Sequence, residues 1–138
     1  MPAWTPNWNP VEIDELGLLD AIADCHAAIS LVQDGHASLR PFVATARERW
    51  EGPARLDFDD NFASLEQQID SVIGQLCQVA LGHQREIVDA HEEQARRTAQ
   101  QQQWWRESAE EQAREAALSE AAAQTTTSDA RPPSRYKQ

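Results

Sequence analysis

The sequence predicts an all-α fold, an antiparallel two-helix hairpin with a long second helix that we expect to pair into a four-helix bundle. Two apolar rows that step by three or four residues run through the chain, and this spacing marks one face of an α-helix. One strong chain-reversal signal separates the rows, the Arg-Trp-Glu-Gly-Pro stretch at residues 49–53. No stretch alternates apolar and polar residues as a strand would.

Residues 1–12 form the first predicted segment, an extended N-terminal arm. They include prolines, which lack a backbone donor, and the two tryptophans Trp4 and Trp8. We expect the arm to fold back on the distal part of the second helix, where Trp104 and Trp105 are within its reach. The alternative is that its tryptophans contact another chain.

The hairpin is predicted over residues 13–97, and its first helix over 13–49. Asp14 and Glu15 suit the positive end of the helix dipole, and arginines occupy the last turn. Gly35 and Pro41 weaken the helix, but the apolar row keeps its register across them, which favours a kinked helix over a loop. The row consists of Leu18, Ile22, Cys25, Ile29, Val32, His36, Leu39, Val43, Ala46 and Trp50.

The second helix is predicted to begin at Pro53 or Ala54, since proline is harmless in a first turn. Its apolar row consists of Phe58, Phe62, Leu65, Ile69, Val72, Leu76 and Val79. Further apolar side chains fall beside that row, and a lone hairpin would leave them partly wet. We therefore predict a partner interface, in a homodimer or heterodimer, made of Ile73, Ala80, Leu81, Ile87, Val88, Trp104 and Trp105.

Beyond the hairpin the apolar row stops. Residues 98–124 are rich in Gln, Glu and Ala, which favours a solvated helical extension. Residues 125–138 contain three threonines and two prolines and are predicted to be a disordered tail.

The formal net charge is −11, and the acidic residues lie mainly in the first 95 positions. Such a surface repels phosphate, which argues against nucleic acid and anionic membranes as partners. We favour the interpretation that the acidic residues only keep the hairpin soluble over the interpretation that they bind a specific basic partner. The N-terminus lacks the basic and apolar regions of a secretory signal, and no apolar run has membrane-spanning length.

No catalytic, metal or cofactor site is expected. The four histidines lack a recognisable zinc spacing, and a two-helix hairpin is not expected to form a concavity of substrate size. The chain is therefore predicted not to be an enzyme. Cys25 and Cys77 could be bridged across the hairpin, but two buried free thiols that act as small apolar groups are favoured.

The turn carries the most specific signal. Trp50, Glu51 and Gly52 fall at the one reversal between two apolar rows, and Phe58 and Phe62 follow. In these residues, and in the block from 80 to 97, the chain resembles the WXG (Trp-x-Gly, ESAT-like) superfamily of type VII secretion. The resemblance implies export without a cleaved signal, as dimers of helical hairpins. It also implies that Trp50 and Gly52 form half of a recognition feature, completed by a Tyr-x-x-x-Asp/Glu motif of the partner. The only tyrosine here, Tyr136, has too few residues after it to supply that motif.

Three functions remain open at this point. The first is a type VII substrate or its dimer partner, secreted by a leaderless route. The second is a cytoplasmic adaptor or chaperone for a toxin or another helical protein, and the third is a structural coiled-coil component.

Overall fold

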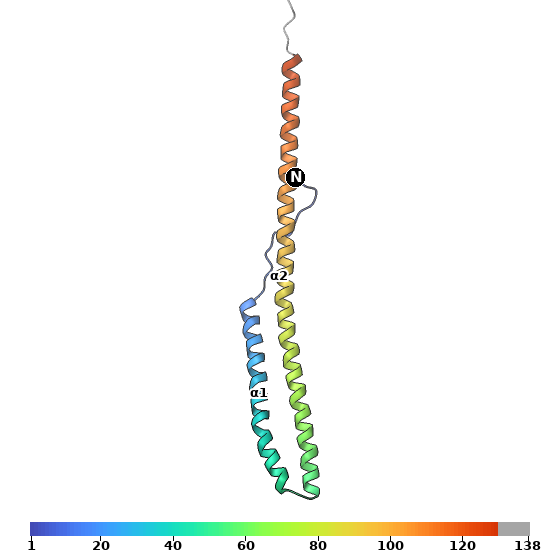
Figure 1. Cartoon of the computed structure of the whole chain (residues 1–138). Coiled ribbons are helices and arrows are strands. Elements are labelled where there is room, and N and C mark those ends of the chain that lie inside the picture. The colour runs from blue at the N-terminus through green and yellow to red at the C-terminus, as the bar shows by residue number, and fades with distance from the viewer. Residues whose placement is uncertain (130–138) are drawn as a thin grey trace, which may run out of the picture. The chain divides into compact units, whose positions relative to one another are not determined.

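The computed structural model describes residues 1–129 and contains two helices, α1 (Glu15–Arg49) and α2 (Pro53–Asp129), with no strand in this range (Figure 1). The predicted all-α hairpin is confirmed, and its pairing into a four-helix bundle stays a prediction. α1 begins at Glu15 because Asp14 caps it: its Oδ1 accepts a hydrogen bond from the Gly17 N–H at 3.0 Å. The helix continues through Pro41, so the prediction of a helix and not a loop is confirmed there, and the kink stays a prediction.

The chain divides into two compact units. The hairpin unit contains Glu12–His91, and the arm unit contains Met1–Val11 with the part of α2 that begins at Glu92. The boundary on α2 precedes the predicted one at residue 97, because arm contacts already begin at Gln94.

The core of the hairpin unit is thin. Ile22 and Cys25 of α1 pack with Ala80 of α2, and Leu76 and Ile87 adjoin this cluster. Val43 and Phe62 are also buried, nearer the turn. No described side chain is completely enclosed, because each helix of a hairpin has only one neighbour.

Polar pairs supplement this core by joining α1 to α2 at three levels. They are His36 Nε2–Glu66 Oε2 at 2.9 Å, Arg47 Nε–Asp59 Oδ1 at 2.7 Å and His91 Nε2–Glu15 Oε1 at 3.1 Å. Their side chains remain partly exposed, so each pair contributes modestly to stability.

The register of α2 differs from the predicted one. Leu65, Val72 and Val79 were expected on the packed face, but they are 40%, 44% and 48% exposed. Ile73 and Ala80 lie on the packed face instead, with the shared positions Phe62 and Leu76. The predicted row and the observed row lie on either side of the same line of positions along α2. The observed row is the packed one because the small Ala80 side chain permits close contact with Ile22 and Cys25.

On α1 the predicted row holds through Val43 with one exception. Leu39 is 39% exposed, and beyond Val43 both Ala46 and Trp50 are exposed as well. Both cysteines are free thiols, as predicted. Cys25 is buried as expected, but Cys77 is exposed, so the prediction that both thiols are buried is wrong for Cys77.

In the arm unit, the N-terminal arm lies along α2, as the sequence predicted (Figure 1). The Trp104 indole N–H donates to the Trp4 carbonyl oxygen, and the Trp4 indole N–H donates to Glu107. An extended chain rises about 3 Å per residue and a helix 1.5 Å, so the arm spans more helix residues than it contains.

α2 also continues past the predicted end of the extension at residue 124. The hydroxyls of Thr125, Thr126 and Thr127 donate to carbonyls one turn earlier, and the helix ends at Asp129. The remainder of the predicted tail, with Tyr136, lies outside the described residues.

Candidate interaction sites

The turn between the helices is built by three consecutive residues. Trp50 leaves α1 in an extended conformation, with φ −113° and ψ 115°. Gly52 has φ +105°, a conformation that side chains other than glycine rarely adopt. Pro53 then begins α2, where its missing N–H leaves no helical acceptor unpaired. The backbone conformation of the turn therefore explains why glycine occupies the third position of the Trp-x-Gly sequence.

The Trp50 indole lies over the end of the hairpin. Its ring centroid is 5.2 Å from that of Phe58, which stacks in turn on Phe62 at 6.2 Å. The side chain nevertheless stays 38% exposed, and its N–H donates no hydrogen bond to any other described residue. Trp50 thus presents an indole edge and a free donor at the surface.

One carboxylate ties the turn together. Asp59 Oδ1 accepts a hydrogen bond from Arg47 at 2.7 Å, and its Oδ2 lies 3.7 Å from Arg55 Nε. Arg55 also donates to the Trp50 carbonyl oxygen at 3.2 Å. The end of α1 and the start of α2 are therefore cross-linked through arginines, which holds Trp50 in a defined position.

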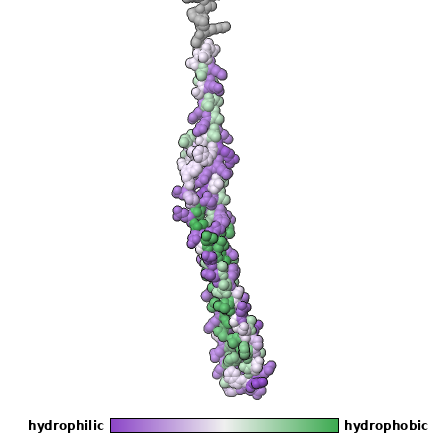
Figure 2. All heavy atoms as spheres, turned by 90° about the vertical axis from the view of Figure 1, so that its left-hand side faces the viewer, coloured by the Kyte–Doolittle hydropathy of each residue, from purple (hydrophilic) through white to green (hydrophobic). Residues whose placement is uncertain are grey.

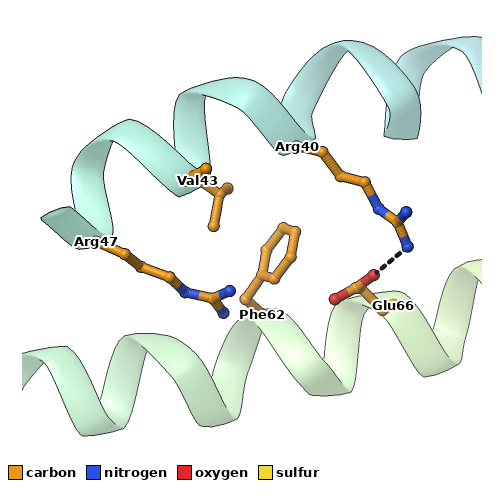
Figure 3. A pocket seen from close by; sticks show the side chains of 6 residues that line it. Arg40, Val43, Arg47, Phe62 and Glu66 are labelled. Atoms are coloured by element: carbon orange, nitrogen blue, oxygen red, sulfur yellow. Dashed lines mark hydrogen bonds and ion pairs between the residues drawn. The ribbon is translucent and has the colours of Figure 1, made fainter.

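A hollow of about 360 Å³ lies beside this cross-link (Figure 3). Arg40 and Arg47 flank an apolar floor of Val43 and Phe62, and the Arg47 guanidinium lies 5.4 Å from the Phe62 ring centroid. The prediction that the hairpin has no concavity of this size is wrong. Both arginines, however, pair with α2 carboxylates, and Figure 3 shows Arg40 reaching Glu66, so they hold the two helices together.

The charge of Glu66 is set by these neighbours. Partial desolvation alone would raise the pKa of the Glu66 carboxyl, but hydrogen bonds from His36 and Arg40 outweigh it and lower that pKa. A second hollow of about 280 Å³ shares Arg40 and is lined by Gln33, His36, Ala37, Asp70 and Ile73. This side of the hairpin is therefore polar at its rim.

The predicted partner interface is only partly free. Ala80, at 3% exposure, is the most buried residue of the hairpin core, and Ile73 and Ile87 are half-buried on the same packed face. They were predicted to be solvent-exposed because the neighbouring row of Leu65, Val72 and Val79 was predicted to pack against α1 in their place. Leu81 and Val88, each 52% exposed, do remain at the surface.

Another row of apolar side chains is exposed along one side of the hairpin. Positions 33, 37 and 40 of α1 and 70 and 73 of α2 line the polar side. Helical geometry puts Leu39, Leu65, Val72 and Val79 on the opposite side, and we call these four residues the apolar edge. The sequence contained this row, but it was assigned to the core.

The outward face of α1 also carries exposed apolar side chains. Figure 2 shows hydrophobic side chains along the hairpin when it is viewed from the α1 side. The most exposed large apolar side chains of α1 are Leu16, Leu31 and Phe42, at 77%, 74% and 76%.

Trp104 and Trp105 of the arm unit differ from each other. Trp104 is half-buried against the arm, and its indole N–H donates to the Trp4 carbonyl at 3.0 Å. Trp105 is 60% exposed and meets Trp8 with ring centroids 5.9 Å apart. Only Trp105 is therefore available to a further partner.

Neither a metal centre nor a membrane span is found in the part of the chain that the structure describes. No three of its His, Cys, Asp and Glu side chains are grouped closely enough to hold an ion. Neither described helix is both long and apolar enough to cross a bilayer.

Comparison with known proteins adds no relative. No family model, curated protein or solved structure matches this chain. The turn and the exposed apolar side chains are therefore the features of this chain that point to its function.

Proposed function

We propose that the chain is a non-enzymatic component of a type VII secretion system, a substrate or its dimer partner, recognised through the turn at Trp50 and Gly52. The observation that carries the proposal is the exposed indole at the only reversal between α1 and α2. An arginine–aspartate cross-link fixes its position, and a positive φ at Gly52 fixes the backbone beside it. A preformed, partly exposed tryptophan is a suitable anchor for another protein.

The second part of the proposal is a helical partner, either another copy or a different WXG-like hairpin. The apolar edge offers the partly exposed surface that a second hairpin would bury. A second chain would also supply the tyrosine motif that the resemblance calls for and residues 1–129 lack. Export would then proceed without a cleaved leader.

Export of matched variants tests this proposal. The chain is expressed in a bacterial host with an active type VII system, and culture filtrate and lysate are blotted for wild type, Trp50→Ala and Trp105→Ala. Trp105→Ala is the control because it removes an exposed indole far from the turn in sequence. We expect wild type and Trp105→Ala in the filtrate, and Trp50→Ala retained although circular dichroism shows it to be helical. Equal export of all three would refute recognition at the turn.

The alternative function is a cytoplasmic adaptor or chaperone for a secreted toxin or another helical protein. The exposed apolar face of α1 favours it, because a carrier needs surface beyond that used in its own hairpin. In this case wild type and both variants stay in the lysate, and the bound protein co-purifies with all three. Substitution of Leu31 and Phe42 by serine would then release it.

A further inference from the structure

The arm unit contains a helix face that binds main chain. Four α2 side chains, at positions 94, 97, 101 and 104, share this face because their spacing of three and four residues follows the helix repeat. All four bond to backbone atoms of the arm, so these contacts do not select its side chains. Gln94 Oε1 accepts a hydrogen bond from the Val11 N–H at 2.8 Å. The other three side chains donate to carbonyl oxygens: Arg97 Nη1 to Asn9 at 3.0 Å, Gln101 Nε2 to Asn7 at 2.8 Å and Trp104 Nε1 to Trp4 at 3.0 Å.

Side-chain selection comes from three arm residues. The Trp4 indole N–H donates to Glu107 Oε2 at 2.7 Å. The Trp8 ring meets Trp104 edge-on, with ring centroids 5.5 Å apart. Pro6, which lies between Trp4 and Trp8 in the sequence, is buried. The face therefore fits an extended segment of the pattern Trp-x-Pro-x-Trp, in which backbone bonds supply affinity and the rings supply specificity.

The closed arm is weakly held. Pro6 is its only buried residue, and Trp8 stays 45% exposed. Hydrogen bonds that merely replace bonds to water add little net stability, so a segment held mainly by them opens readily. An open arm leaves both a free ligand and a free receptor face on the same chain.

We propose that the α2 face from Gln94 to Glu107 is a receptor for extended Trp- and Pro-containing segments, and that its second occupant is the arm of another copy of this chain. Every copy carries both halves, and the main-chain bonds are the same whether the arm comes from its own chain or a neighbour. Exchange of an identical segment between protomers is a low-cost route to a dimer. The proposal does not depend on recognition at Trp50.

Single-cysteine chains test the exchange. In a Cys25→Ala, Cys77→Ala background, one chain carries Asn7→Cys and a second, differently tagged chain carries Gln101→Cys. The chains are mixed, treated with a short bifunctional thiol cross-linker and separated by denaturing electrophoresis. The control pair carries Gln102→Cys, on an exposed position beside the face. We expect about tenfold more heterodimer with Gln101→Cys than with Gln102→Cys, because docking raises the local thiol concentration.

A chain with both Asn7→Cys and Gln101→Cys reports docking within one molecule. Cross-linking of that chain without any excess heterodimer in the mixture overturns exchange. Dimers seen by size exclusion without the specific cross-link would show that the hairpins pair while each arm stays bound to α2 of its own chain. That result also overturns arm exchange.

A second measurement avoids cysteine substitutions. A labelled synthetic peptide of residues 1–12 is titrated into the full chain and followed by fluorescence anisotropy. We expect the Trp8→Ala chain, with its own arm loosened, to bind the peptide about tenfold more tightly than wild type, and Trp104→Ala to abolish binding. An unchanged anisotropy with the helical Trp8→Ala chain at millimolar concentration overturns the receptor assignment.

Discussion

The hairpin unit and the arm unit give α2 two different kinds of neighbour. In the hairpin unit a second helix packs on it through apolar side chains, and Ala80 is the most buried of them. In the arm unit an extended segment lies on it, and polar helix side chains bond to its main chain: Arg97 and Gln101 donate to carbonyl oxygens, and Gln94 accepts from an N–H. The apolar row of α2 ends where the arm begins to bind. Stability should therefore reside in the hairpin unit, and exchange and opening in the arm unit.

The largest effect should come from the hairpin core. Phe62→Ala removes a ring that is 7% exposed and contacts both Phe58 and the Arg47 guanidinium. We expect it to lower the free energy of unfolding by about 3 kcal/mol. Phe42→Ala is the matched control, and at 76% exposure it should change the free energy by less than about 0.5 kcal/mol. Urea unfolding followed by circular dichroism measures both, and equal losses would contradict the assigned core.

The register of α2 gives the next effect. Ala80→Leu forces a larger side chain against Ile22 and Cys25 and should cost about 2 kcal/mol. Val79→Leu, one position earlier on the apolar edge, should be nearly neutral in the isolated chain. The same unfolding experiment compares them. If Val79→Leu proved the more destabilising, the originally predicted row would be the packed one.

A smaller effect is expected in the arm unit. Trp104→Ala removes one hydrogen bond to Trp4 and the ring contact with Trp8, worth about 1 to 2 kcal/mol together. The arm should open while the helicity of the hairpin is retained. Hydrogen exchange at the Trp4 indole N–H, followed by NMR, should become about tenfold faster, since 1.4 kcal/mol corresponds to a factor of ten. Faster global unfolding instead would show that the two units are not separable.

Acid should weaken both units slightly. Hydrogen bonds from Gln103 and Trp4 lower the pKa of Glu107, and those from His36 and Arg40 lower the pKa of Glu66. Because these pKa values are lower in the folded state, their contribution is present above the unfolded value, about 4.3, and disappears as the pH falls below it. Tryptophan fluorescence between pH 6 and pH 3 reports on the arm. Glu107→Gln keeps an acceptor for Trp4 without the charge, so it should flatten that transition, whereas Glu120→Gln should not.

Much of this architecture follows from local sequence signals. The apolar repeat predicts both helices, the Gly-Pro pair predicts their junction, and the tryptophans with prolines predict an arm that returns to α2. These features are local or depend on periodicity, so one chain suffices to infer them. The distinction between Trp104 and Trp105 is not local, because it depends on which ring lies under the arm.

By itself, the sequence determined that α1 and α2 form, that they reverse at Gly52, and that the arm carries the residues to bind a helix. Only the tertiary structure decided which flank of α2 meets α1. The row of Leu65, Val72 and Val79 and the row of Ile73, Ala80 and Ile87 have the same seven-residue period and adjoin the same central positions, so periodicity cannot rank them. Packing can, because the small Ala80 side chain, at 3% exposure, is enclosed with Ile22 and Cys25 in the buried cluster. That choice leaves the other row at the surface, where a partner can reach it.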